Sequence, residues 1–154
     1  MLRKNGQTMV EMLVAVAIVV LVLVAVVSRV VAAVASANFA RNQALSTRFS
    51  QEGLEWARSQ RDSLGWAGFS PYVSSSPTYC VPDLTQGIGS LTSGSCLTTA
   101  TIPGTIFLRE VRFIYVAPGG QEPYTDIIST VSWRDRVGWH RSTLATRLTR
   151  WSTQ

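Results

Sequence analysis

The sequence predicts an α+β protein in which one long N-terminal helix packs on a C-terminal antiparallel sheet of about three to four strands. Three observations predict this class. Residues 12–27 contain no charged or polar side chain. Residues 30–62 continue without proline, and their apolar and charged side chains recur at helical spacing. Three later segments are rich in β-branched and aromatic residues and are separated by turn signals.

The first half of the helix is predicted to cross a membrane. With Met9 and Val10 the apolar run covers about 19 residues, a helical rise of roughly 28 Å that nearly matches the hydrocarbon thickness of a bilayer. Arg3 and Lys4 precede the run and favour a cytoplasmic N-terminus. We therefore expect a single-pass protein of the cytoplasmic membrane, N-in and C-out, with an extracytoplasmic domain after the span.

Glu11 is the one charged residue in the stretch 9–27. A charge at the centre of a bilayer costs about 2.5 to 3.5 kcal/mol, and less near its edge, so it tends to have a partner and a function. A secretory signal peptide cut near residues 33–37, or a plain membrane anchor, would account for the apolar run. The run, however, exceeds the roughly 7 to 15 residues of a signal peptide, and neither alternative explains Glu11.

The stretch 4–11, KNGQTMVE, resembles the type IV prepilin signature of a basic leader ending in glycine, a mature chain with glutamate as its fifth residue, and a long apolar helix. The resemblance implies that prepilin peptidase cuts between Gly6 and Gln7 and N-methylates the new Gln7 amine. It also implies that Glu11 serves filament assembly as the counter-charge of a neighbouring subunit's N-terminal ammonium, at low local dielectric. The family usually begins its mature chain with Phe, so Gln7 favours a minor pilin or pseudopilin.

On this resemblance the chain is a structural subunit of a type IV pilus or a type II secretion pseudopilus, with a major pilin as the alternative within the same class. The implied partners are other subunits through the N-terminal helix, prepilin peptidase, the inner-membrane assembly platform and the cytoplasmic membrane. The implied final location is an extracytoplasmic filament or the cell surface. The alternative from another class is a single-pass membrane-anchored or secreted extracytoplasmic binding domain.

The chain is expected to divide into five segments. They are a leader at 1–6, a transmembrane and filament-core helix at 7–28, its amphipathic continuation at 29–64, an irregular loop region at 65–104, and the antiparallel sheet of a globular head at 105–154. The continuation carries an apolar stripe of Leu45, Phe49 and Trp56, which should face the head. The helix is expected to end at Gly65, Gly68 and Pro71. The strands are expected at 105–116, 125–134 and 139–151.

Cys80 and Cys96 are the two cysteines of the chain, and both lie in the Ser/Thr/Gly-rich loop region. Outside the cytoplasm such a pair is most simply a disulfide, and the alternative is two free or buried thiols. Two sulfurs without a nearby histidine cannot make a zinc site, so no metal is predicted.

The sequence predicts neither an enzyme nor a cofactor. His140, the single histidine, lacks a motif that would supply a nucleophile and an orienting acid, so we expect an exposed, structural role. The net charge is +5 and would fall to +3 with loss of Arg3 and Lys4. DNA could bind the arginines near the C-terminus, but arginines pointing outward from a sheet over a tryptophan-lined core explain them more simply. These arginines are Arg134, Arg136, Arg141, Arg147 and Arg150.

Overall fold

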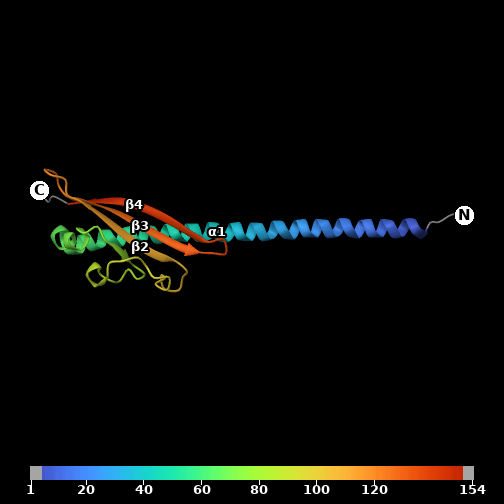
Figure 1. The fold of residues 1–154 in the computed structure, drawn as a ribbon, viewed down its shortest axis with the longest axis horizontal. Coiled ribbons are helices and arrows are strands. Elements are labelled where there is room, and N and C mark those ends of the chain that lie inside the picture. Colours follow the sequence, from blue (N-terminus) through green and yellow to red (C-terminus); the bar gives the residue numbers. More distant parts are fainter. Residues whose placement is uncertain (1–4, 151–154) are drawn as a thin grey trace. The chain divides into compact units, whose positions relative to one another are not determined.

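The computed structural model describes residues 5–150, with side chains from residue 9 onward. Its elements are, in order, the helix α1 (Asn5–Val73), the strand β1 (Thr78–Cys80), the short 3-10 helix η1 (Ile88–Ser90), and the strands β2 (Leu108–Val116), β3 (Tyr124–Arg134) and β4 (Trp139–Thr149). The four strands form one sheet in the order β1-β2-β3-β4, and every neighbouring pair is antiparallel (Figure 1). The predicted α+β class is therefore confirmed.

Two compact units make up the chain, Met1–Arg41 and Asn42–Gln154. In the first unit the described residues are helical, and every side chain from residue 9 to residue 41 is exposed. The second unit, called the head below, contains the rest of α1 and the whole sheet.

The regular part of α1 ends before Gly65, whose φ of 65° and ψ of 167° are not helical. The predicted stop at this glycine is correct in that respect, but a further helical stretch runs to Val73 and includes Gly68 and Pro71. The side chains of Phe69 and Val73 are fully buried. Their burial offsets the backbone hydrogen bond that Pro71 cannot donate, which is why Gly68 and Pro71 do not stop the chain from being helical.

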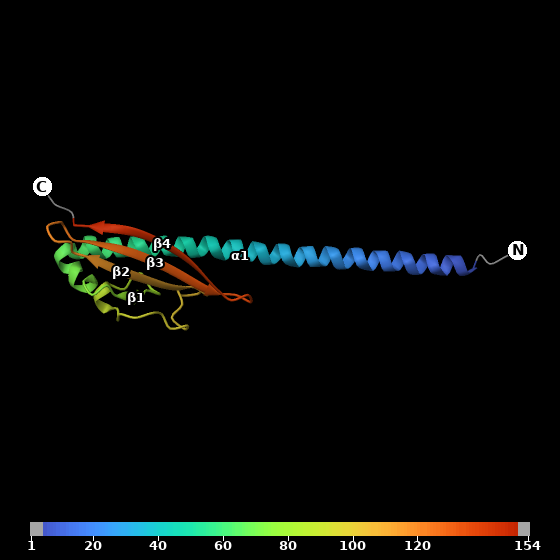
Figure 2. The same cartoon turned by 45° about the horizontal axis from the view of Figure 1, so that its top comes forward.

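The sheet packs on the head's part of α1 through one face (Figures 1 and 2). On β3 the residues Ile127, Val131 and Trp133 are all fully buried, as the alternation of this strand predicts. Two apolar clusters result. The larger lies around Leu54, Trp56, Ala57, Val111, Phe113 and Ile127, and the smaller joins Phe107, Val131 and Trp133 to Leu45 and Phe49 of the predicted helix stripe.

Polar side chains of α1 cover β4, the edge strand of the sheet. The Ser50 hydroxyl donates to the Ser142 carbonyl oxygen at 3.3 Å, and the Thr47 hydroxyl lies 3.2 Å from the Ser142 hydroxyl. Further along the strand, Arg58 donates to the Thr146 hydroxyl at 3.1 Å. One backbone carbonyl group and two hydroxyl groups of β4 therefore have partners on α1, which helps to protect this edge from pairing with another strand.

A glycine allows the helix to approach the sheet closely. A Cβ atom at position 53 would lie 3.1 Å from the Cδ atom of Arg109 and would overlap the hydroxyl of Ser129. Both of these residues are buried in the sheet. Gly53 is therefore required by packing, although glycine disfavours a helix interior.

The region 65–104, expected to be irregular, also holds β1 and η1. β1 pairs with β2 so that Tyr79 lies opposite Val111. A strand of three residues is too short to show a periodicity in the sequence, so the sequence does not predict the position of β1. The region carries the predicted disulfide between Cys80 and Cys96. The backbone N–H of Cys96 also donates to the Glu110 carboxylate at 2.7 Å, which joins this loop to β2.

Candidate functional site

The residues of the candidate processing and assembly site lie at the start of α1. Gly6 and Gln7 are within the first turns of the helix, and Glu11 follows. Residues 7 and 11 are four apart, so they stand one above the other on the helix with a rise of about 6 Å between them. The structure thus places the Gly6–Gln7 peptide bond one helical turn before the carboxylate.

Glu11 is surrounded along its own helix by exposed apolar side chains. Met9, Met12 and Leu13 are 71%, 71% and 67% exposed. No lysine or arginine occurs from residue 9 to residue 28, and Glu11 forms no ion pair with any residue between 9 and 150. A cationic partner for Glu11 must therefore come from outside the described part of the chain.

The helix around this site has the composition of a membrane span. Its most apolar window of 18 residues has a mean hydropathy of 3.2, and none of that window is buried within the protein. By length and composition α1 is the one helix of the described residues that could cross a membrane. A helix that is apolar on every side is stable in lipid or against other apolar helices, not in water.

Comparison with known families agrees with this geometry. Residues 1–27 match the family described as the prokaryotic N-terminal methylation motif. No curated protein and no solved structure shows a significant match to the chain. The long apolar helix and the four-stranded antiparallel sheet define a protein of pilin-like α+β architecture. The matched motif is the prepilin-type signal of type IV pilins, and the match is confined to the first 27 residues of the chain.

The motif also bears on what kind of protein this is. It indicates a structural subunit that assembles with other pilin subunits and is processed by a peptidase. Together with the apolar helix it fits a membrane-anchored protein of the pilus type. Among the residues from 9 to 150, no group of three or more His, Cys, Asp or Glu side chains is arranged to hold a metal ion.

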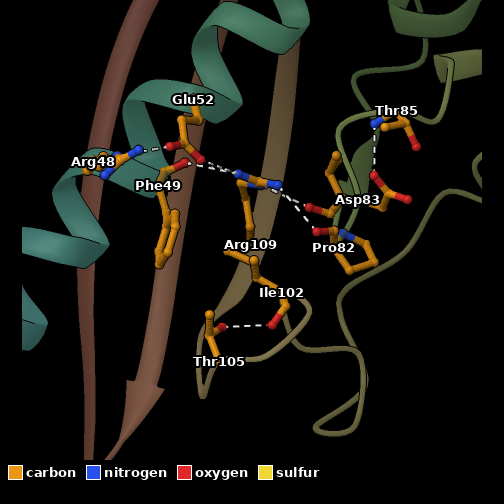
Figure 3. A network of polar contacts seen from close by, with 10 residues as sticks. Arg48, Phe49, Glu52, Pro82, Asp83, Thr85, Ile102, Thr105 and Arg109 are labelled. Carbon is orange, nitrogen blue, oxygen red and sulfur yellow. Dashed lines mark hydrogen bonds and ion pairs between the residues drawn. The ribbon is translucent and has the colours of Figure 1, made fainter.

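Arg109 has a role in the head that the sequence does not predict (Figure 3). Its side chain is 2% exposed. The Nε–H group donates to the Val81 carbonyl oxygen at 2.9 Å, and the two terminal nitrogens reach the carbonyl oxygens of Pro82 at 3.3 Å and Phe49 at 3.4 Å. Arg109 therefore connects β2 with the loop after β1 and with α1.

Two acidic side chains, Glu52 and Asp83, act on the charge of Arg109. A carboxylate oxygen of Glu52 lies 3.5 Å from an Arg109 nitrogen, and Glu52 also pairs with Arg48 at 3.2 Å. Burial lowers the pKa of the Arg109 guanidinium, and the Glu52 carboxylate acts in the opposite direction. The sequence does contain a signal for the burial of Arg109. Alternate residues of a strand share one face of the sheet, and Arg109 alternates with the buried residues Val111 and Phe113.

His140 is half-buried, which corrects the expectation of an exposed residue. Its ring stacks on Trp133 with a centroid distance of 5.3 Å, and its Nε2 atom lies 2.9 Å from a carboxylate oxygen of Asp135. The hydrogen bond from His140 lowers the pKa of the Asp135 carboxyl, and the backbone N–H groups of Val137 and Gly138 act in the same direction. His140 thus helps to hold the β3–β4 turn together.

Proposed function

We propose that the chain is a structural subunit of a type IV pilus or of a type II secretion pseudopilus, a minor pilin or pseudopilin. In this proposal prepilin peptidase cuts the chain between Gly6 and Gln7, and the subunit then assembles through its N-terminal helix. The observation that carries the proposal is the order of Gly6, Gln7 and Glu11 at the start of a helix whose following side chains are apolar and exposed.

Cleavage would change the chemistry of the helix start. It removes Arg3 and Lys4 and creates a new α-amine at Gln7, which the same enzyme would methylate. A methylated amine still carries a positive charge, and in a filament core that charge needs a counter-ion, because an isolated ammonium in an apolar medium is strongly destabilised. Glu11 of a neighbouring subunit supplies that counter-ion and fixes the axial position of the incoming helix.

The head is assigned to the extracytoplasmic side. Its disulfide between Cys80 and Cys96 is of the kind that persists in oxidising compartments, and the basic leader favours a cytoplasmic N-terminus. The subunit would then wait in the cytoplasmic membrane, N-in and C-out, until the inner-membrane assembly platform moves it into a filament. Its final location is an extracytoplasmic filament or the cell surface.

A membrane-anchored binding domain is the second candidate function, and the mature N-terminus separates the two. The experiment is to express the chain with its cognate peptidase, purify it from membranes, and measure its intact mass and N-terminal sequence. The proposal requires a mature chain that begins at Gln7 and whose intact mass includes one added N-methyl group. Met1 still present, or a start at Ser36 or Asn38, would instead assign a plain anchor or a signal peptide.

A pair of variants tests whether the cut depends on the glycine. In Gly6→Leu the peptidase should leave the chain uncut, because a branched side chain replaces the hydrogen atom next to the scissile bond. The matched control Asn5→Ala changes the preceding residue and keeps the glycine, and its mature mass should equal that of the wild type. Cleavage of Gly6→Leu at the same bond would show that another enzyme makes the cut.

A further inference from the structure

The turn between β3 and β4 carries an unusual combination of exposed side chains. We call residues 134–141 the hairpin tip. Val137 is 89% exposed and Trp139 is 54% exposed. Three arginines of the tip are also exposed, and none of them forms an ion pair with another residue in the range 9–150. They are Arg134, Arg136 and Arg141.

The acidic residue of the hairpin tip is used within the turn. One carboxylate oxygen of Asp135 accepts hydrogen bonds from the backbone N–H groups of Val137 at 2.8 Å and Gly138 at 3.0 Å. The other lies 2.9 Å from His140, and the Asp135 N–H donates to the Gly138 carbonyl oxygen at 3.0 Å. The tip is therefore ordered before it meets any partner, and its outward charge is that of the arginines.

The strand register places the aromatic ring of the tip among these charges. Arg134 lies opposite Trp139, and Arg141 lies opposite Ser132. Opposite residues of an antiparallel pair share a face of the sheet. Trp133, the next residue in β3, is buried in the core, so Arg134, Trp139 and Arg141 lie on the face that points away from α1.

The hairpin tip lies at the end of the head where the helical segment of the head begins. Trp133 packs with Leu45 and Phe49 in the smaller cluster, and Figures 1 and 2 show β3 running toward the start of the head's helical segment. The head begins at Asn42. Ser28, the last residue of the predicted membrane span, precedes Asn42 by 14 residues, a helical rise of about 21 Å. Chain length therefore limits how far the start of the head can lie from a membrane that holds the predicted span.

We propose that the hairpin tip binds the anionic phospholipid surface of the membrane that anchors the helix. Guanidinium groups pair with lipid phosphates in a bidentate manner. A tryptophan beside them favours the headgroup level, where its ring is partly in lipid and partly in water. The three arginines and Trp139, with Val137 at the apex, match this chemistry. The inference rests on the membrane anchoring in the proposed function, but it requires neither cleavage nor filament assembly.

Hydrogen exchange in lipid nanodiscs tests the proposal with the full chain. The chain is placed in discs of phosphatidylcholine alone and in discs that contain one quarter phosphatidylglycerol. We expect the amides of 134–141 to exchange about tenfold more slowly in the anionic discs at low salt, and to lose this protection in about 0.5 M salt, where charges are screened within a few ångströms. The triple variant Arg134→Gln, Arg136→Gln, Arg141→Gln should lose the protection at low salt as well.

Two further variants make the test specific. The matched triple variant Arg112→Gln, Arg147→Gln, Arg150→Gln removes the same charge from exposed arginines outside the tip, and it should keep the protection. Trp139→Ala should weaken it without changing the salt dependence. Equal exchange rates in the two kinds of disc, or an equal loss in both triple variants, would overturn the proposal.

A nucleic acid is the competing partner for such a surface. Protection of the tip by a short DNA duplex in phosphatidylcholine discs, without any protection by phosphatidylglycerol, would also overturn the lipid proposal and assign the tip to nucleic-acid phosphates. The exchange measurement can be read on uncut, unassembled protein. A failure of this inference is therefore distinguishable from a failure of the proposed processing at Gly6.

Discussion

Replacement of Arg109 by methionine should destabilise the head strongly. Methionine keeps much of the side-chain volume but removes the charge and every hydrogen-bond donor. Replacing a complete buried ion pair by apolar residues can be neutral. Here, however, three of the four acceptors are backbone carbonyl groups, those of Val81, Pro82 and Phe49, and no side-chain substitution can remove them. Without the arginine, the Val81 and Pro82 carbonyl groups would lose this donor in a desolvated place, and the Phe49 carbonyl group would keep only its helical hydrogen bond.

The magnitude follows from the geometry of the four contacts. The 2.9 Å bond to the Val81 carbonyl oxygen is a charge-assisted bond of good length, for which about 2 kcal/mol is typical. The bonds to Pro82 and Phe49 are 3.3 and 3.4 Å long and contribute less. Glu52 is one third exposed, so solvent screening reduces the value of its pair with Arg109. We expect a loss of about 3 to 5 kcal/mol in the free energy of unfolding, a large part of the stability of a typical domain.

Near-ultraviolet circular dichroism of the full chain in detergent is the suitable assay. It reports the packing of the buried residues Trp56 and Trp133, whereas the far-ultraviolet signal would be dominated by the long helix. The thermal midpoint of Arg109→Met should fall by at least about 12 °C, at roughly 4 °C per kcal/mol. Arg109→Lys should fall nearly as far, because an ammonium group cannot reach carbonyl groups on three segments with a planar fork.

The matched control is Arg58→Met, which alters an arginine that is 40% exposed and pairs with Glu55. An exposed pair of this kind contributes about 1 kcal/mol or less, so this midpoint should fall by only a few degrees. A midpoint of Arg109→Met equal to that of Arg58→Met would refute the reasoning. It would mean that water satisfies the three carbonyl groups once the arginine is gone.

Three other perturbations have defined outcomes. Glu11→Gln should leave membrane insertion and processing intact but keep the protein out of sheared filaments, because an unpaired buried ammonium costs roughly 3 to 5 kcal/mol. Quantitative blots of the membrane and filament fractions measure how much protein is incorporated. Glu55→Gln, which alters an exposed carboxylate, is the control. Gly53→Ala should lower the thermal midpoint of the head because the new methyl group meets Ser129 and Arg109, even though alanine is favoured over glycine in helices by about 1 kcal/mol. The control Gly119→Ala should not lower the midpoint, because a Cβ atom there would meet nothing within 4 Å. Arg147 lowers the pKa of the Asp126 carboxyl by hydrogen bonding, so the stabilisation by this pair is complete above the ordinary carboxyl pKa of about 3.9 and is lost as the pH falls through the lower folded value. The difference in thermal midpoint between wild type and Asp126→Asn should therefore be present at neutral pH and shrink in strong acid, and a difference that grows in acid would contradict this sign.

How much the sequence predicts depends on how local the determining contacts are. The candidate site is encoded in consecutive residues, since Gly6, Gln7 and Glu11 are separated by fixed distances along one helix, and the whole signal can be read without any tertiary contact. The buried face of β3 is similarly predictable, because alternation along a strand is a local property. The strand limits needed only small changes. β2 begins at Leu108 and not at residue 105, and β4 ends at Thr149 and not at residue 151.

The features that the sequence did not reveal depend on packing between distant segments. The helical stretch after Gly65 exists because Phe69 contacts Phe113, with a ring-centroid distance of 5.8 Å, and this contact overrides the local signals of Gly68 and Pro71. The sequence does not predict the inward position of Arg109, because an arginine in a strand usually faces outward. Its inward position makes sense only when the carbonyl groups of the loop and of α1 lie around it.

The two units differ in how many of their polar groups and apolar side chains already have partners within the protein, and this difference bears on the proposed assembly. In the head, hydroxyl groups of α1 contact part of β4, one edge strand of the sheet. At the other edge, the backbone of Ser93 forms a bridge to Tyr79 of β1. The apolar side chains of the head are largely gathered in two clusters. Pairing of sheet edges between subunits would first have to break these contacts. In the first unit, by contrast, the apolar side chains from residue 9 onward are exposed, and Glu11 lacks a partner among the described residues. In the proposed filament, assembly would therefore gain free energy from the helices, whose apolar side chains and Glu11 lack partners among the described residues, while the head would keep its own contacts.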